Sequence, residues 1–131
     1  MNADEEIVEI SALLHDITRL SGDHKNHHIS GQLEAEKILK EFNYPQNKIE
    51  KVKHCIHAHR GSKEIKRETI EADIVASADA MAHISQVSIF FYKEKKWIKE
   101  KIERSWKKLM PEAKSMMLKK YEAIKLFLNN S

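Results

Sequence analysis

Apolar residues recur at intervals of three and four along most of the chain, which is the spacing of one face of an α-helix. The pattern begins with Ile7, Ile10, Leu13, Leu14 and Ile17. Only 3 glycines and 2 prolines interrupt the chain, and no alternating strand pattern persists for more than a few residues. These features predict an all-α fold, a single-domain bundle of about six helices.

Turn-forming residues set the expected helix ends. Asp4 is a suitable N-cap for the first helix, and the Ser-Gly-Asp sequence at 21–23 is a suitable stop. The third helix is expected to begin at Pro45, because proline suits a first helical turn. The other helices are predicted at about 30–42, at about 69–92, and as two C-terminal helices within about 94–129 that Pro111 separates.

The same spacing predicts which side chains are buried. We expect Leu33, Ile38 and Leu39 in the core from the second helix, and a stripe of Ile70, Ile74, Ala78 and Met81 on the fourth. Both tryptophans and the Met116-Met117 pair are expected to be core residues.

Composition limits the classes of protein that this chain can belong to. Its 131 residues suit one domain, and 33% charged with 41% hydrophobic residues is a globular composition. The 23 basic and 20 acidic side chains are too nearly balanced to indicate nucleic-acid binding. The lysine-rich segment at 93–108 alternates with glutamates and apolar residues, as a solvated helix face does. We therefore expect no nucleic-acid partner.

The expected compartment is the cytoplasm. Cys55 is the only cysteine, which excludes an internal disulfide and fits a reducing environment. The acidic N-terminus does not resemble a signal peptide, and no apolar run approaches the ~18 residues of a membrane span. No membrane partner is expected.

The eight histidines all lie between His15 and His83, and the last 48 residues contain none. Metal sites and acid–base sites concentrate imidazole, because it is neutral near pH 7 and is a good donor. His15 and Asp16 are adjacent, and Asp16 could bridge two ions because a carboxylate has two oxygens. Asp79 lies in an apolar stretch, where a carboxylate needs a partner or a metal.

Each of these residues has an ordinary structural explanation when it is taken alone. His15 and Asp16 could be helix-end residues, and Asp79 could be a hydrogen-bonded buried carboxylate. His27 could cap the second helix. The combination of these residues favours a metal site.

Four segments in order resemble the HD superfamily of metal-dependent phosphohydrolases. They are VEISALLHDI, HHISGQLEAEKIL, KVKHCIHAHR and EADIVASADAM, and they span residues 4 to about 84. The resemblance implies a helical bundle and one or two divalent ions, with manganese, iron, nickel, magnesium and zinc not distinguished. The metal-site portion of the chain would be residues 4 to about 84, and the C-terminal helices at about 94–129 would follow it.

The resemblance also implies roles for individual residues. His15 and Asp16 match the signature pair, to which we assign the catalytic role, and Asp79 matches the closing carboxylate. His27 and His59 match the further ligands of the subgroup that can bind a second metal. The less certain ligands are His28, His54 and His57.

The implied chemistry is hydrolysis of a nucleotide or another small phosphate ester by a metal-activated water. The alternative is a catalytically silent HD-type domain that binds metal or nucleotide for regulation, or is structural only. The basic residues near the proposed ligands are candidates for binding the substrate phosphate: Arg19, Arg60, Lys63, Lys66 and Arg67. A solvated loop is an equal explanation for this basic cluster.

Two departures from the family pattern affect these expectations. The family's first ligand is a histidine on a helix before the His-Asp helix, and none of the 14 residues before His15 is a histidine. We hypothesise that the chain starts one helix late, and that a homodimer partner could cover the apolar surface this exposes. Ser77 stands where relatives often place an acidic residue.

Overall fold

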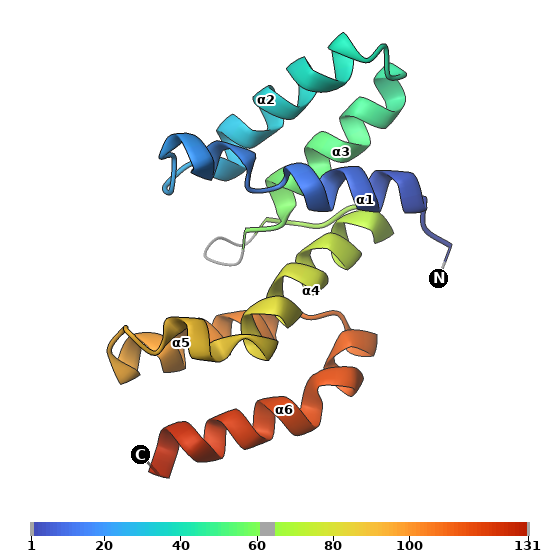
Figure 1. Cartoon of the computed structure of the whole chain (residues 1–131). Coiled ribbons are helices and arrows are strands. Elements are labelled where there is room, and N and C mark those ends of the chain that lie inside the picture. Colours follow the sequence, from blue (N-terminus) through green and yellow to red (C-terminus); the bar gives the residue numbers. More distant parts are fainter. Residues whose placement is uncertain (1, 61–64, 131) are drawn as a thin grey trace. The chain divides into compact units, whose positions relative to one another are not determined.

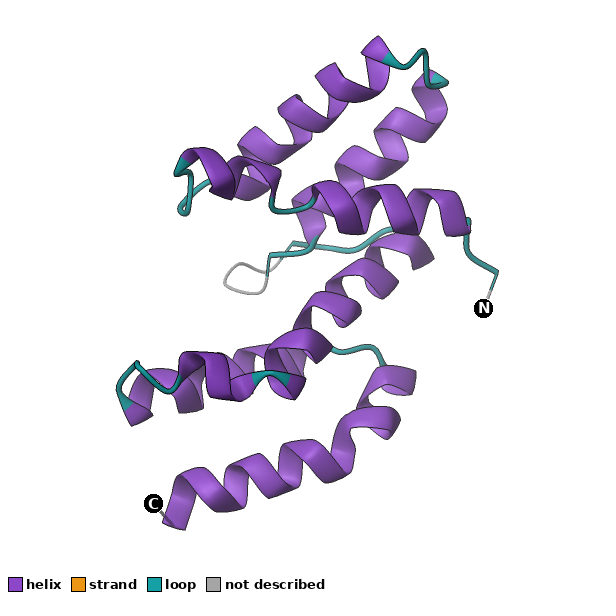
Figure 2. Cartoon of the chain, viewed as in Figure 1, coloured by secondary structure: helices purple, strands orange, loops and turns teal. Residues whose placement is uncertain are grey.

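The computed structural model describes residues 2–60 and 65–130, and most of these residues are helical, with no strand among them. The helices and their order are shown in Figures 1 and 2. The all-α prediction and the number of about six helices are confirmed. The elements are α1 (Glu5–Leu14), η1 (Ile17–Ser21), α2 (His27–Glu41), α3 (Gln46–Ala58), α4 (Ile70–Ser85), η2 (Val87–Phe90), α5 (Lys95–Lys108) and α6 (Pro111–Asn130), where η denotes a 3-10 helix.

The chain divides into two compact units, Met1–Ala76 and Ser77–Ser131, with the division inside α4. Each unit has its own core, and each is described by itself below. No helix in the described parts of the chain is both long enough and apolar enough to cross a lipid bilayer.

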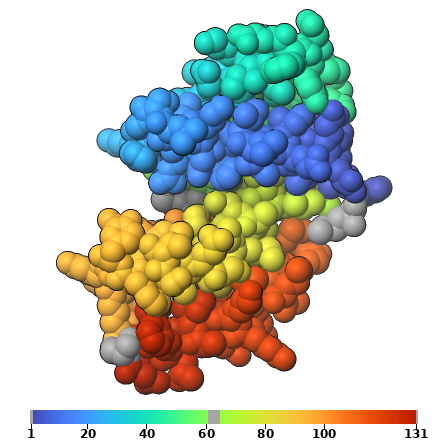
Figure 3. Space-filling view, viewed as in Figure 1, coloured from blue at the N-terminus to red at the C-terminus, as the bar shows by residue number. Residues whose placement is uncertain are grey.

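Unit 1 is built on a hairpin of α2 and α3, with α1 packed on α3 and η1 packed on α2. The space-filling view shows the atoms of η1, in blue, against those of α2, in cyan (Figure 3). Asp4 caps α1 as predicted, because its carboxylate accepts from the backbone N–H groups of Glu6 and Ile7. The core of unit 1 is made of Ile7, Ala35, Leu39, Ile49, Val52, Cys55, Ile56, Ala58, Ala72 and Val75.

Unit 2 contains α5 and α6, which pack on each other, and η2, which packs on α5. Its core includes Tyr121, whose ring stacks on that of Trp106 with 4.0 Å between centroids. Pro111 separates α5 from α6 as predicted, and it is the first residue of α6. The other buried residues of this core are Ala80, Ile84, Ile98, Ile102, Leu109, Ala113, Met117 and Leu128.

The predicted core of α2 is wrong in one position. Leu33 is 63% exposed, and Ile38 is only half-buried. The buried face of α2 instead carries His27, His28 and small residues, because Gly31 and Ala35 allow neighbouring segments to approach the helix closely. A stripe that is defined by large apolar residues therefore missed the buried face.

The predicted fourth helix is too long and its stripe is misplaced. α4 ends at Ser85 and a separate 3-10 turn follows, and Ala78 is exposed. Met116 is exposed as well, whereas Met117 is buried. The buried residues of the α4 segment are Glu71, Ala72, Val75, Ala76, Ser77, Ala80 and Ile84.

Candidate metal centre

His15 and Asp16 lie where α1 stops. His15 keeps helical angles (φ −59°, ψ −30°), but Asp16 leaves them (φ −113°, ψ 15°) and directly precedes η1. Adjacent side chains on a continuous helix would diverge by about 100°. With this change in the backbone, Nε2 of His15 lies 3.5 Å from Oδ2 of Asp16.

Two other helix ends bring histidines to the same carboxylate. His27 is the first residue of α2, and His59 follows the last residue of α3. Their Nε2 atoms lie 3.4 Å and 3.5 Å from Oδ1 of Asp16, and 3.3 Å from each other. We call His15, Asp16, His27 and His59 the carboxylate cluster.

Close packing of α2 places His27 in this cluster. A Cβ on Gly31 would lie 3.2 Å from Cγ2 of Ile56 and 3.6 Å from the carbonyl oxygen of His15, so a larger residue would push α2 away. The Ser30 hydroxyl donates to Oδ2 of Asp23 at 2.5 Å, which ties α2 to the segment after η1. No pattern in the sequence predicts this bond.

Hydrogen bonds to the backbone set which ring nitrogens of two histidines carry protons. Nδ1 of His15 lies 2.7 Å from the Ala12 carbonyl oxygen, and Nδ1 of His59 lies 2.5 Å from the Ile56 carbonyl oxygen. A carbonyl oxygen can only accept, so both Nδ1 atoms are donors. In the neutral rings, each Nε2 then has a lone pair directed into the cluster, as metal-binding histidines require.

The electrostatics of the cluster favour the ligand forms of Asp16 and His27. Burial raises the pKa of Asp16, but the close imidazole of His59 and the positive charges of His15, His59 and Arg19 outweigh burial and lower the pKa to about 2. Burial, and then the charge of His59, lower the pKa of His27. At neutral pH the carboxylate is therefore ionised and His27 is neutral, which is what a metal ion needs.

The donor set fits a divalent transition metal. Ligand atoms at about 2.1 Å from one ion are roughly 3.0–3.4 Å apart, close to the 3.3–3.5 Å separations among Asp16, His27 and His59. Oδ1 of Asp16 is buried and has no hydrogen-bond partner among the described residues. His15, Asp16 and His59 each offer one ligand atom, and these three atoms lie within 4.8 Å of one another. Two histidines and one carboxylate are a known ligand set for such ions.

Comparison with known proteins agrees with this geometry. The family model described as the HD domain matches residues 1–84, which is more than half of the chain and includes every member of the cluster. This chain belongs to the HD domain family. No curated protein and no solved structure matches it. The predicted resemblance to the superfamily of metal-dependent phosphohydrolases is thereby confirmed.

Asp79, the fifth predicted ligand of this HD domain, is described within unit 2. Its Oδ2 accepts from Nζ of Lys108 at 2.6 Å, and its Oδ1 lies 3.7 Å from Nε2 of His83. The side chains of Asp79 and Lys108 are only 14% and 8% exposed. The carboxylate in the apolar stretch thus has a charged partner, as its burial requires, and its role as a ligand stays a prediction.

Ser77 has a structural partner in unit 2. Its buried hydroxyl accepts from the backbone N–H of Met110 at 2.9 Å, which ties α4 to the start of α6. The hydroxyl at this position therefore supports the fold of unit 2.

Each of the three less certain histidines has a polar or ring partner in unit 1. Nε2 of His54 accepts from the backbone N–H of Glu68 at 2.9 Å, and Nδ1 of His57 lies 2.9 Å from Nε2 of Gln32. The ring of His28 stacks on that of His57 with 5.6 Å between centroids. Burial, and then the charge of His54, lower the pKa of His57.

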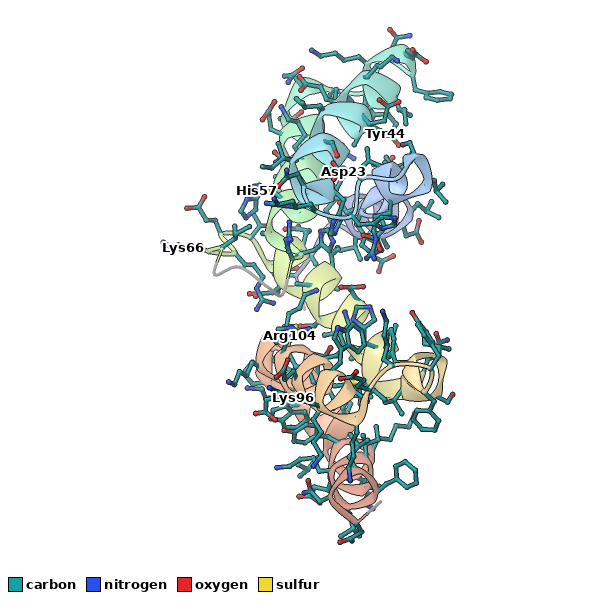
Figure 4. All side chains as sticks on the ribbon, turned by 90° about the vertical axis from the view of Figure 1, so that its left-hand side faces the viewer. Asp23, Tyr44, His57, Lys66, Lys96 and Arg104 are labelled. Atoms are coloured by element: carbon teal, nitrogen blue, oxygen red, sulfur yellow. The ribbon has the colours of Figure 1, made fainter. Side chains whose placement is uncertain are left out.

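The predicted phosphate-binding residues differ in their surroundings. Nη1 of Arg19 lies 3.7 Å from Oδ2 of Asp16, and Arg60 hydrogen-bonds to His28. Lys66 is exposed and projects from the segment between α3 and α4 (Figure 4). Nε of Arg67 lies 3.5 Å from Oδ1 of Asp73. Lys63 is outside the described residues.

Lys108 is the residue that sequence reasoning missed. It shares the buried face of α5 with Ile98, Ile102 and Ser105, at intervals of three and four. A lysine on the buried face of an amphipathic helix needs a buried anion as its partner. The spacing alone could have signalled that Lys108 has a carboxylate partner.

Proposed function

We propose that this HD domain hydrolyses a nucleotide or another small phosphate ester, with a divalent metal ion at the carboxylate cluster. The observation that carries the proposal is the convergence of the Nε2 atoms of His15, His27 and His59 on the carboxylate of Asp16, at 3.4–3.5 Å. Membership of the superfamily supports the reaction class.

Each residue of the cluster has a defined task in this reaction. Asp16 is the shared anionic ligand, with Oδ1 toward His27 and His59 and Oδ2 toward His15. The carbonyls of Ala12 and Ile56 hold the rings of His15 and His59 in orientation. A divalent ion bound here supplies Lewis acidity toward the phosphoryl oxygens and lowers the pKa of a water.

Arg19 and Arg60 are the proposed donors to the substrate phosphate. Guanidinium groups bind phosphate oxygens through paired N–H groups, which gives both charge and orientation. Arg19 is 44% exposed beside Asp16, and Arg60 follows His59 directly in the chain. Both arginines therefore belong to segments that also provide ligands.

Turnover of a phosphoester panel by manganese-loaded protein tests the proposal. The panel contains nucleoside mono-, di- and triphosphates and p-nitrophenyl phosphate. We expect hydrolysis of at least one ester by the wild type and a loss of at least about 100-fold in Asp16→Ala. His24→Ala is the matched control, because His24 is an exposed histidine three residues from His27. Equal rates in wild type and Asp16→Ala would assign the hydrolysis to a contaminant.

One observation favours the alternative, a silent HD domain that binds metal or nucleotide for regulation. The carboxylate of Asp79 is paired with the ammonium group of Lys108, and a lysine so placed competes with a metal ion for that carboxylate. Metal binding without turnover of any ester in the panel would support this alternative.

A further inference from the structure

The segment that directly follows Asp16 is not held in place by the apolar core. This segment, η1, has no buried residue, and Leu20 within it is 91% exposed. Nevertheless η1 packs on α2, whose first residue is His27. The separation of 3.4 Å between the ligand atoms of Asp16 and His27 is therefore set largely by polar contacts between η1 and α2.

Ser30, in the first turn of α2, makes these polar contacts. Its hydroxyl donates to Oδ2 of Asp23 at 2.5 Å, and its Oγ lies 2.9 Å from Oγ1 of Thr18 in η1. Oγ1 of Thr18 in turn lies 3.4 Å from the carbonyl oxygen of His27. We call Thr18, Asp23 and Ser30 the hydroxyl tie. It joins η1, the turn after η1 and the start of α2.

Asp23 is a fixed anchor for the hydroxyl tie. Its Oδ1 accepts from the backbone N–H of Asn26 at 2.8 Å, and its own N–H donates to the carbonyl oxygen of Thr18 at 3.1 Å. The hydrogen bond from Ser30, and then that from Asn26, lower the pKa of the Asp23 carboxyl group. The group is thus an anion at neutral pH and can only accept, so the single hydroxyl proton of Ser30 points to it.

The tie lies beside the backbone of the signature pair. A Cβ added at Gly31, the residue after Ser30, would lie 3.6 Å from the carbonyl oxygen of His15 and 3.8 Å from Oγ1 of Thr18. Because no core residue holds η1, loss of the tie would let η1 shift against α2. Such a shift would change the distance between the Asp16 carboxylate and the ring of His27.

We propose that Ser30 is a positioning residue of the metal centre, which holds the Asp16 carboxylate at the distance from His27 that one divalent ion requires. The inference rests on the proposed function, since it assigns a role at the metal site of that function. Ser30 touches neither metal nor substrate and acts through Thr18 and Asp23. Removal of a group that orients metal ligands typically weakens metal binding by roughly 10- to 100-fold.

Binding of cobalt(II) tests the inference, because its affinity is measured by competition with a chelator and its visible absorption reports the ligand geometry. Ser30→Ala removes the hydroxyl of the tie, whereas Ser30→Thr keeps it. Ser21→Ala is the matched control, because the Ser21 hydroxyl donates within η1, to the carbonyl oxygen of Thr18 at 3.2 Å.

We expect Ser30→Ala to bind cobalt(II) about tenfold more weakly and with a changed visible spectrum. Ser30→Thr should restore both the affinity and the spectrum, and Ser21→Ala should match the wild type. The double variant of Ser30→Ala with Asp23→Ala should bind cobalt(II) no more weakly than Asp23→Ala alone, because both changes break one tie.

Two results would overturn the inference. A lower Tm of Ser30→Ala with the affinity and spectrum of the wild type would make the tie a structural contact only. Equal weakening in Ser21→Ala would mean that any loosening of η1 has this effect.

Cobalt(II) binding also separates this inference from the proposed function. If Ser30→Ala weakens cobalt(II) binding but no ester is hydrolysed by the wild type, the inference stands and the hydrolase proposal fails. If the wild type hydrolyses an ester and Ser30→Ala binds cobalt(II) as tightly as the wild type, the inference alone is wrong.

Discussion

The Nε2 atoms of His27 and His59 lie 3.3 Å apart, although 32 residues separate these histidines in the sequence. The first begins α2 and the second ends α3, so the hairpin of these two helices sets their distance. Both atoms also face Oδ1 of Asp16. Two ring nitrogens and one carboxylate oxygen at these distances have the spacing of ligands around one metal ion.

The charge of Asp16 should stabilise the metal-free protein, and this effect should disappear in acid. Its folded pKa of about 2 is below the unfolded value of 3.8, so the stabilisation is present above about pH 4 and is lost as pH falls toward 2. The full shift would correspond to about 2.4 kcal/mol. We expect about 1 kcal/mol, because the side chain is 38% exposed and solvent screens its interactions.

Urea unfolding of wild type and Asp16→Asn in the presence of chelator measures this contribution. The difference in the free energy of unfolding should be largest at pH 5 and should shrink steadily down to pH 2.5. A difference that stays constant over this range would mean that Asp16 is not ionised at an unusually low pH.

Lys108→Met should destabilise the protein by about 3 kcal/mol, because it leaves the carboxylate of Asp79 without its buried cation. Lys107→Met is the matched control, since Lys107 is the exposed neighbour on the same helix. Thermal and urea unfolding measure the loss. The double variant with Asp79→Leu should lose less than the sum of the single variants. Purely additive losses would show that the two charges do not interact.

Tyr121 should ionise at a higher pH than an ordinary tyrosine. Burial, followed by the hydrogen bond that its hydroxyl donates to Glu103 at 2.7 Å, raises its pKa above 10.0. Its contribution to stability is therefore complete below pH 10 and is lost as pH rises through the folded pKa. Phenolate absorbance of wild type minus that of Tyr121→Phe measures this ionisation. A difference spectrum with a midpoint at pH 10 would contradict the prediction.

Gly22→Ala should destabilise the turn after η1 by about 1 kcal/mol, because Gly22 has a φ of +96°, which residues with a Cβ rarely adopt. A Cβ there would meet no atom within 4 Å, so backbone strain is the only expected cause. Gly22→Asn should be less harmful, since asparagine tolerates a positive φ better. Urea unfolding measures all three proteins, and equal losses in both variants would contradict the backbone explanation.

The fold class and part of the candidate site could be predicted from the sequence because they depend on local patterns. Helical spacing and the low number of helix breakers predicted the all-α class, the cap at Asp4 and a helix boundary at Pro111. The resemblance to the HD superfamily implies His15, Asp16, His27 and His59 as ligands, and the structure brings these four together.

Features that depend on tertiary packing could not be predicted. Leu33 is exposed because Gly31 and Ala35 define the close-packed face of α2, and helical spacing alone does not reveal which face has the closer neighbour. The partner of Asp79 is Lys108, 29 residues away, and a sequence pattern does not identify such a pair. The contact of Arg60 with His28 likewise depends on the α2–α3 hairpin.

Metal content by elemental mass spectrometry tests the central claim most directly. The protein is purified without a chelator or a histidine tag, and the variants Asp16→Ala and His59→Ala are compared with the control His24→Ala, each checked for retained helicity. We predict about one or two transition-metal ions per chain in the wild type and the control, and a loss of this metal in both cluster variants. A wild type that is metal-free and does not take up manganese, iron, nickel or zinc would contradict a metal centre at Asp16.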